Sequence, residues 1–318
     1  MTTIRIAGVP EHFNLPWHLA IENGDFKKEA IDLQWTDVPE GTGKMCQMLR
    51  DGSTDIAIIL TEGIVKDITV GNPSKIVQVY VETPLIWGIH VAAQSKYENL
   101  AQLEGTKAAI SRIGSGSQLM AYVNAGNQKW DANSLSFEIV NTIDGAVTAL
   151  TEGTADYFMW ERFMTQPLVD KGIFRRIADC PTPWPCFVVA VREEILNQNP
   201  EIITKILEVI NSNTLNFKLL PNIIKKLAVR FHQKEEDLEK WLALTEWSQN
   251  QLSENVLNNV QNQLLELGII DKKSTFAEIV KYIEGLFDIA DKELDSDKRY
   301  LIQFFNKGKV KENLEEAY

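Results

Sequence analysis

Leu49-Arg50-Asp51-Gly52-Ser53-Thr54-Asp55-Ile56-Ala57 is spelled a second time, later in the chain, as Leu150-Thr151-Glu152-Gly153-Thr154-Ala155-Asp156-Tyr157-Phe158. Both stretches read Leu, any residue, an acid, Gly, Ser or Thr, any residue, Asp and then an apolar run. The Gly is typical of the left-handed residue that ends a helix, and the run after Asp predicts a buried strand. A helix-turn-strand unit used twice predicts two similar α/β lobes with a cleft between them, where ligands commonly bind. Gly-Ser-x-Asp is also common turn chemistry, so the repeat alone does not establish this.

The composition bounds the class of protein. With 318 residues, of which 44% are hydrophobic, the chain can bury a large core, and its length favours two domains. A net charge of −12 speaks against a nucleic-acid partner, since binding a phosphate backbone requires clustered Lys and Arg.

Cysteines and apolar segments indicate the compartment. Cys46, Cys180 and Cys186 are an odd number without metal-ligand spacing, which favours a reducing compartment and no bound metal. The residues after Met1 lead directly into a strand pattern without the basic and apolar regions of a signal peptide. No apolar run is long enough to span a bilayer. We therefore expect a cytoplasmic protein that is not embedded in a membrane.

Strand and helix patterns alternate through the first half of the chain, which predicts mainly parallel sheets covered on both faces. The first lobe is predicted to contain strands at 4–9, 31–35, 55–60, 76–81 and 87–93, and helices at 14–23, from 40–43 onward and at 62–70. The second is predicted to contain strands at 107–111, 135–140, 157–160 and 174–177, and helices at 117–125 and 143–150. A further strand at 187–191 is expected to carry the chain back to the first lobe.

After Arg192 the pattern is wholly helical, at 202–210, 238–247, 256–267 and 276–287, and we expect this tail to pack against the first lobe. The predicted boundaries are 1–91 plus 189–318 for lobe 1 with its C-terminal helices, and 92–188 for lobe 2. The lobes are joined by crossing segments near Ala92 and Val188, which permits hinge closure.

Several ordered motifs resemble one known family. They are Asn14-Leu15-Pro16 with Ala20, Gly24 to Glu29 with Ile31-Asp32-Leu33, Leu49 to Ile59, Leu103 to Lys107 and Leu150 to Asp156. Together they resemble the type 2 periplasmic-binding-protein fold, in the branch of alkanesulfonate-, nitrate- and thiamine-pyrimidine-binding proteins related to ABC transporters. The resemblance implies a small-molecule ligand held between two lobes by loops at the strand ends, as open α/β sheets generally bind ligands.

The clearest site signal is Ser111 to Gln118, between a predicted strand and a helix. Its Gly residues let a backbone approach a ligand, while hydroxyl groups and free amides at a helix start favour an anion. The resemblance implies a sulfonate, phosphate or carboxylate there. An ordinary capped turn is the alternative, and we favour ligand contact by Arg112, Gly114, Ser115, Gly116 and Ser117.

Glu40-Gly41-Thr42-Gly43-Lys44 is the counterpart in the first lobe. Thr42 and Gly43 are candidate donors to the ligand from the opposite wall, although a plain N-cap explains Thr42 equally well.

Loop tips at predicted strand ends supply the remaining candidates for ligand binding. These are Phe13, Asn14, Thr61, Glu62, Thr83, Trp87, Asn141, Asp144, Trp160, Glu161 and Trp184. Phe13 and the three tryptophans predict a flat or apolar ligand body. A single Trp is more often a packing residue, so the prediction depends on their coincidence.

No catalytic set is assembled in the sequence, and we assign no catalytic residue, cofactor or metal. His12 is the one histidine placed where it could touch a ligand, and no base is evident near Cys186. The thiamine-pyrimidine synthase that the chain resembles consumes its own active-site His, and that place falls here on Gly63.

The sequence therefore favours a monomeric binding protein for a small anionic metabolite, pyrimidine-like or sulfonate-like, and gives no support for a transporter partner. The alternative is an intracellular enzyme on the same fold, resembling the thiamine-pyrimidine synthase or the menaquinone-pathway enzymes, with Glu62 or Glu161 as acid or base.

Overall fold

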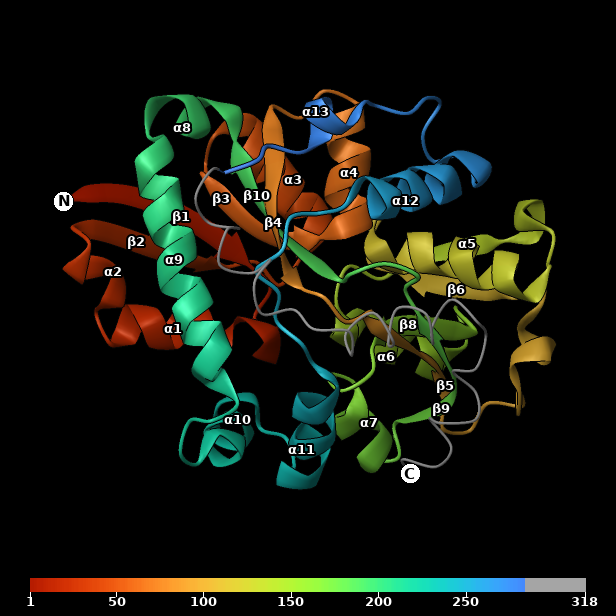
Figure 1. Ribbon diagram of the computed structural model, residues 1–318. Coiled ribbons are helices and arrows are strands. Elements are labelled where there is room, and N and C mark those ends of the chain that lie inside the picture. The colour runs from red at the N-terminus through yellow and green to blue at the C-terminus, as the bar shows by residue number, and fades with distance from the viewer. Residues whose placement is uncertain (284–318) are drawn as a thin grey trace. The chain divides into compact units, whose positions relative to one another are not determined.

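Two five-stranded sheets organise the chain in a computed structural model that describes residues 1–283 (Figure 1). The first sheet has the order β2-β1-β3-β10-β4, and the second has the order β7-β6-β8-β5-β9. The first is built from β1 (Thr2–Gly8), β2 (Ile31–Asp37), β3 (Ile56–Leu60), β4 (Ser74–Val81) and β10 (Phe187–Arg192). The second is built from β5 (Ile86–Ala92), β6 (Lys107–Ile110), β7 (Ser136–Ile139), β8 (Tyr157–Glu161) and β9 (Phe174–Pro181). The predicted two-lobed α/β fold is confirmed.

The two sheets are paired in the same way. β1 is parallel to both β2 and β3, and β6 is parallel to both β7 and β8. Each sheet also contains a strand that runs against its neighbours, β10 between β3 and β4, and β5 between β8 and β9. A mainly parallel core of alternating strands and helices, closed by antiparallel strands, follows from the βαβ pattern of the sequence.

The repeated sequence forms the same turn in both lobes. Gly52 ends one helix with φ 76° and Gly153 ends the other with φ 74°, the left-handed conformation that favours glycine. The next strand then begins beside a parallel neighbour, β1 in the first sheet and β6 in the second, where the Asp55 amide donates to the Arg5 carbonyl and the Asp156 amide to the Lys107 carbonyl.

Helices cover the first sheet. They are η1 (His12–Asn14), α1 (Leu15–Glu22), α2 (Asp25–Lys28), α3 (Thr42–Asp51), α4 (Thr61–Thr69), α8 (Glu193–Gln198), α9 (Pro200–Phe217), α10 (Ile223–Phe231), α11 (Glu235–Leu244), α12 (Glu254–Glu266) and α13 (Phe276–Ile279). As predicted, the helical tail contacts this lobe, with α9 packing on α1 and α2, and α12 and α13 on α4.

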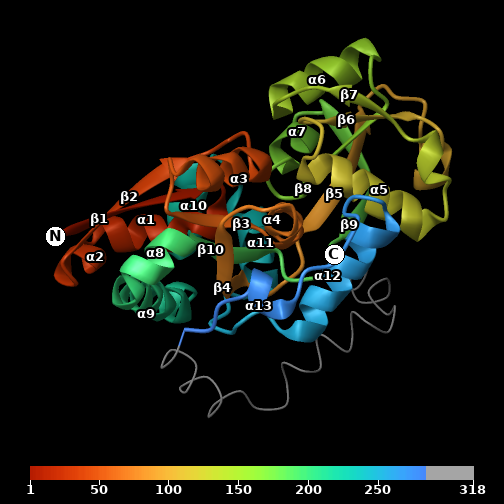
Figure 2. The ribbon, with the colours of Figure 1, turned by 90° about the horizontal axis from the view of Figure 1, so that it is seen from above.

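The second sheet carries η2 (Leu100–Leu103), α5 (Gly116–Gln128), η3 (Ala132–Ser134), α6 (Ile143–Glu152) and α7 (Gln166–Asp170). Figure 2 shows α5, α6 and α7 grouped around this sheet, apart from the helices of the first sheet. The hydrophobic core of this lobe connects the repeated sequence with β9, because Leu150 and Phe158 of the repeat and Phe174 of β9 belong to one buried cluster.

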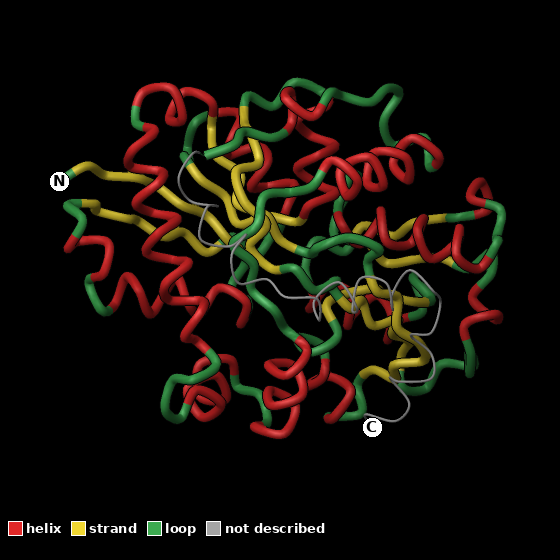
Figure 3. The backbone as a smooth tube through the Cα atoms, in the orientation of Figure 1, coloured by secondary structure: helices red, strands yellow, loops and turns green. Residues whose placement is uncertain are grey.

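Two helices of the tail end earlier than predicted (Figure 3). α11 ends at Leu244, and the chain then extends so that Trp247 pairs with Val81 in an isolated bridge. α13 ends at Ile279, where Val280 pairs with Ile76, and the last part of the predicted 276–287 helix lies outside the described residues. In both places pairing to β4 replaces the last helical turn. None of the helices in residues 1–283 is long and apolar enough to cross a membrane.

The connections between the sheets fall earlier than the predicted positions near residues 92 and 188. The chain leaves the first sheet after Val81, and β5, which we expected in lobe 1, inserts between β8 and β9. It returns through residues 182–186 before β10 begins. The two connections are hydrogen-bonded to each other, because Thr182 and Leu85 exchange bonds of 3.0 Å and the Cys186 amide donates to the Thr83 carbonyl. The lobes are thus joined by residues 82–85 and 182–186, which form a short ribbon of two hydrogen-bonded segments.

Candidate functional site

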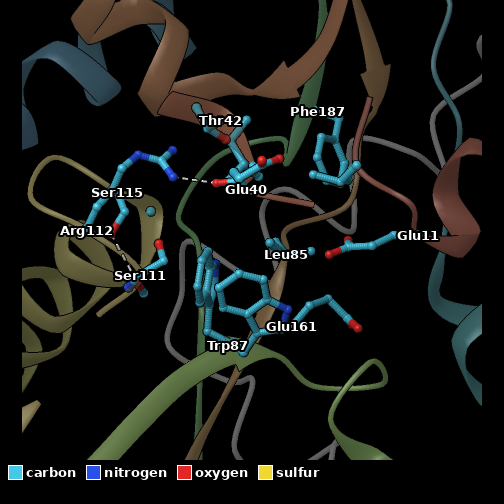
Figure 4. Close-up of a pocket in the computed structure, with 16 residues that line it drawn as sticks. Glu11, Glu40, Thr42, Leu85, Trp87, Ser111, Arg112, Ser115, Glu161 and Phe187 are labelled. Carbon is cyan, nitrogen blue, oxygen red and sulfur yellow. Dashed lines mark hydrogen bonds between the residues drawn. The ribbon is translucent and has the colours of Figure 1, made fainter. Parts of the chain in front are cut away.

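A narrow pocket with a cavity volume of about 50 Å³ lies between the two lobes (Figure 4). It is lined by residues of both lobes, Val9, Glu11, Glu40, Gly41, Thr42, Leu60 and Phe187 from the first, Trp87, Ser111, Arg112, Ser115, Gly116, Ser117, Trp160 and Glu161 from the second, and Leu85 from the connection. The side chains are not evenly distributed. Hydroxyl groups, Arg112 and Glu40 lie on one side, and the carboxyl groups of Glu11 and Glu161 lie on the other.

The start of α3 forms the wall of the first lobe. The residue before α3 is Gly41, with φ 76°, and because glycine has no side chain the start of α3 has no side-chain cap. Thr42 packs tightly against Gly63 of α4, where any Cβ would clash with the Thr42 methyl group. An uncapped helix start facing a pocket favours an anion, because its amides carry partial positive charge.

The start of α5 forms the opposite wall and is more self-contained. The Ser115 hydroxyl accepts from the Gln118 amide at 3.3 Å and lies 3.0 Å from the Ser117 hydroxyl, which in turn accepts from the Ser111 amide at 3.0 Å. All three serines are buried. The predicted anion loop is therefore a capped turn that also lines the pocket, and its contact with a ligand stays a prediction.

Gly116 lies close to both Trp87 of its own lobe and Leu60 of the first lobe. A Cβ on Gly116 would lie 3.1 Å from Trp87 and 3.2 Å from Leu60. These distances are tighter than ordinary van der Waals contact, which explains the need for glycine at this position.

Arg112 spans the pocket mouth. Its Nη1 donates to the Glu40 carbonyl at 2.5 Å, and its guanidinium lies against Gly43 at the start of α3. A Cβ on Gly114 would lie 3.3 Å from Lys66 Nζ, so a second cation lies beside the same loop. Two cations and two helix starts make this side of the pocket positive, in a protein with a net charge of −12.

Two buried carboxyl groups lie at the other side. Glu11 is 8% exposed and Glu161 is 3% exposed. Burial, with repulsion from Glu161, raises the pKa of Glu11 to about 8, and burial raises the pKa of Glu161 to about 7. Glu161 accepts from the Met164 amide at 2.6 Å, whereas the Glu11 carboxyl points into the pocket (Figure 4).

His12 lies behind these acids, and it does not line the pocket. Its Nε2 lies 4.0 Å from Glu161, its ring packs on Trp241, and neither ring nitrogen has a hydrogen-bond partner within residues 1–283. Burial lowers the pKa of His12 to about 3, so the imidazole is neutral at physiological pH. It is a packed core histidine in this arrangement.

Two of the four predicted aromatic residues face the ligand space. Trp87 and Trp160 meet edge to face, with ring centroids 6.3 Å apart. The Trp87 Nε1 is buried and has no hydrogen-bond partner in the described part of the chain. A buried indole N–H normally has an acceptor, so this one is available to a ligand.

Eight of the predicted residues thus come together in the pocket, and they are Thr42, Trp87, Arg112, Ser115, Gly116, Ser117, Trp160 and Glu161. Gly43 and Gly114 lie beside it, next to Arg112 and Lys66.

Four predicted residues hold the connections between the lobes and do not line the pocket. The Trp184 Nε1 donates to Glu62 at 2.7 Å, the Thr61 hydroxyl donates to the Pro185 carbonyl at 2.6 Å, and the Thr83 hydroxyl accepts from the Glu246 amide at 3.3 Å. Burial raises the pKa of Glu62 to about 7. These side chains fix the geometry of the ribbon between the sheets.

The remaining four predicted residues are also outside the pocket. The Asn14 side-chain amide donates to the Val9 carbonyl. The Phe13 ring packs against Trp241 edge-on and against Phe187 at a tilt, so both residues shape the segment after β1. Asn141, with φ 62°, and Asp144 belong to the start of α6, which is capped by Thr142.

Sequence reasoning did not select Glu11, Leu60, Leu85 or Phe187. Position at the end of a strand could have identified two of them, since Glu11 lies three residues after β1 and Leu60 is the last residue of β3. Among the described residues no group of three His, Cys, Asp or Glu side chains could hold a metal ion. Cys46, Cys180 and Cys186 are buried and unpaired, and burial raises the pKa of each thiol.

This strand order, with a pocket between two α/β lobes, defines a class. The chain has the type 2 periplasmic-binding-protein fold. A family model described as Ca3427-like periplasmic binding protein matches residues 87–180. No curated protein matches the chain.

Solved structures give the same result. The CA3427 gene product of Candida albicans, with the generic periplasmic-binding-protein fold, is 23% identical over 94% of this chain and 100% of its own, with a TM-score of 0.81. The alkanesulfonate-binding protein SsuA of Xanthomonas axonopodis pv. citri, bound to MOPS, is 16% identical over 89% and 99%, with a TM-score of 0.76. The aliphatic sulphonate-binding protein SsuA of Escherichia coli is 16% identical over 93% and 96%, with a TM-score of 0.67.

Proposed function

We propose that the protein binds a small organic anion in the pocket between its two lobes and releases it chemically unchanged. One observation carries the proposal. The start of α3, the start of α5 and the Arg112 guanidinium, which come from both lobes, converge on the same pocket. Helix starts and a guanidinium are the groups that recognise sulfonate, phosphate and carboxylate.

The similar structures support this choice of ligand. Two of them are sulfonate-binding proteins by name, and one holds MOPS, itself a sulfonate. We therefore propose a sulfonate-like ligand or an anionic, thiamine-pyrimidine-like ligand whose flat or apolar body lies against Trp87 and Trp160.

We also propose that the lobes close on the ligand. Arg112 already reaches from the second lobe to the Glu40 carbonyl of the first, and the two connecting segments form a narrow ribbon about which the lobes can rotate. As a monomeric cytoplasmic protein it would act as a sensor, carrier or buffer of its ligand. Three buried, unpaired cysteines support a reducing compartment.

Native mass spectrometry of the purified protein, followed by thermal-shift measurements with short alkanesulfonates and carboxylates, tests the proposal. A bound anion and a rise in melting temperature are expected, because a ligand that binds only the folded state stabilises it. Arg112→Ala should weaken binding by about tenfold or more. The control is Arg230→Ala. Arg230 is an exposed arginine of the helical tail, and it forms an ion pair with Glu22 of α1. No stabilisation by any small anion would contradict the proposal.

The acids at the other end of the pocket favour a second candidate function, an enzyme that transfers a proton to or from its ligand. Carboxyl groups with a pKa near neutrality suit such a role. Mass spectrometry of the ligand after incubation separates the two candidates. A binding protein returns it unchanged, whereas an enzyme converts it, and Glu161→Gln would then abolish the conversion.

A further inference from the structure

The pocket is polarised between two ends of opposite chemistry. Arg112, Ser111 and Ser115 lie on one side of the space, and Glu11 and Glu161 lie on the other (Figure 4). Trp87 lies between the two ends. An anion alone would use only the first end and would leave the second without a partner.

The acid end is incomplete without a ligand. No hydrogen bond or ion pair is formed by the Glu11 carboxyl within residues 1–283, although the residue is only 8% exposed and its carboxyl points into the pocket. Buried polar groups are almost always hydrogen-bonded, so an unpaired carboxyl directed at a pocket indicates a missing partner.

Surrounding groups do not supply that partner. The neutral His12 lies behind Glu161, and the Cys186 thiol, whose pKa is raised by burial and by nearby carboxyl groups, supplies no cation. Arg162 and Arg176 attract the Glu161 carboxylate, but neither lines the pocket. The group that faces both acids from the pocket must therefore come from the ligand.

We propose that Glu11 and Glu161 together bind a positively charged nitrogen, so that the ligand of this pocket is a zwitterion with its anionic group at Arg112 and its cationic group at the acid end. A carboxylate pair in a buried site binds an ammonium or amidinium group through charge-assisted hydrogen bonds. This inference rests on the proposed function, which accounts only for the anionic end.

Proton release is an independent signature of such a ligand. In the empty pocket Glu11 is mostly protonated at pH 7 and Glu161 about half protonated, because their pKa values are raised to about 8 and about 7. A cation beside them favours the charged carboxylates and therefore expels protons when it binds. An anion without an amino group leaves these acids protonated and releases none.

Matched ligand pairs test the inference. Isothermal titration calorimetry at pH 7 would compare 3-aminopropanesulfonate with propanesulfonate, and 4-aminobutyrate with butyrate, in two buffers that differ in ionisation enthalpy. We expect the amino compound of a pair to bind about tenfold tighter or better, with proton release. Glu11→Gln and Glu161→Gln should each remove most of that preference while retaining the affinity for the amine-free anion.

Glu62→Gln is the matched control, a buried glutamate with a similarly raised pKa that does not line the pocket. Its ratio of affinities within each pair should equal that of the unmodified protein. Glutamine has the shape of protonated glutamate, so these substitutions change the charge with little change in packing. The two ligands of a pair can also be compared in the unmodified protein, without any substitution. Equal affinities within both pairs would overturn the zwitterion inference and leave anion binding standing. Failure of all four compounds to bind would contradict the proposed function as well.

Discussion

The two copies of the repeated sequence have the same backbone but different surroundings. In the first lobe the Asp55 carboxylate accepts from the Arg5 amide at 2.9 Å, and in the second the Asp156 carboxylate accepts from the Lys107 amide at 2.8 Å. Each aspartate thus holds the start of its strand beside its parallel neighbour, β1 for Asp55 and β6 for Asp156. This shared role explains why Asp occupies the same position in both copies.

The partners beyond the backbone differ. Asp55 also accepts hydrogen bonds from Arg5 Nε at 3.0 Å and Arg5 Nη2 at 2.5 Å, and Arg192 lies 3.8 Å away. Within residues 1–283, the side chain of Asp156 accepts only from the Tyr97 hydroxyl, at 3.2 Å, besides the amide. The repeat therefore specifies a backbone junction, and each lobe adds its own side-chain support. In the first lobe these ionic contacts connect three strands, because Arg5 lies on β1, Asp55 directly precedes β3 and Arg192 is the last residue of β10.

The largest difference between the copies should appear when the aspartates are removed. We expect Asp55→Ala to cost about 3 kcal/mol of unfolding free energy, because it leaves two arginines and an amide without their carboxylate. Asp156→Ala should cost about 1.5 kcal/mol, through one charged hydrogen bond to an amide and one to a hydroxyl. Urea denaturation of both variants measures the two values.

A double-mutant cycle with Arg5→Ala provides the control for Asp55, since the coupling energy isolates the ion pair from the backbone contact. Equal losses for the two aspartates would show that the charged partners of Asp55 contribute nothing, as many exposed pairs do.

The copies also differ in the glutamate that follows each strand. Glu62 is tied to Trp184 in the connection between the lobes, whereas Glu161 faces the pocket. Burial raises the pKa of Glu62 from 4.5 to about 7, so its neutral form is the one favoured by folding. The stability from this group is fully present below pH 4.5 and is lost as the pH rises through about 7.

Glu62→Gln should therefore reduce the loss of stability between pH 5 and pH 8, by an amount on the order of 2 kcal/mol. Thermal or urea unfolding at several pH values measures it, in a window where the carboxyl groups of exposed residues are already ionised. Glu194→Gln, on the surface of α8, is a suitable control. A pH profile unchanged in Glu62→Gln would show that the carboxyl is already solvated in the folded protein.

Local signals allowed the fold to be predicted from the sequence. The Gly turn, the Asp and the apolar run lie within nine residues, and the structure forms them as a continuous helix-turn-strand unit in both lobes. The anion loop was equally local, and Ser115 and Ser117 both reach the pocket. The position of β5 could not be predicted in this way, because its pairing with β8 and β9 depends on residues far along the chain.

The candidate site was predictable only in part for the same reason. Loops at the ends of strands look alike in sequence, yet Trp87 and Trp160 face the pocket while Trp184 turns to Glu62 in the connection. Glu11 was overlooked because a single acid after a proline carries no motif. Its role becomes visible only once the fold places Glu161 on the same side of the pocket.

The smallest expected difference concerns the glycines that end the two helices. Gly52 and Gly153 both adopt the left-handed conformation, which costs a residue with a Cβ about 1 kcal/mol. A Cβ on Gly153 would meet nothing within 4 Å, but a Cβ on Gly52 would lie 2.9 Å from the Arg192 guanidinium, which also contacts Asp55. Gly52→Ala should therefore cost roughly 1 kcal/mol more than Gly153→Ala in urea denaturation, because it displaces that guanidinium as well as straining the turn. In an Arg192→Ala background the steric part of the cost should disappear and the two glycine variants should become equal. If Gly52→Ala remains the costlier variant in that background, its excess strain lies in the turn itself, and the side-chain support of the first lobe is not what distinguishes the two junctions.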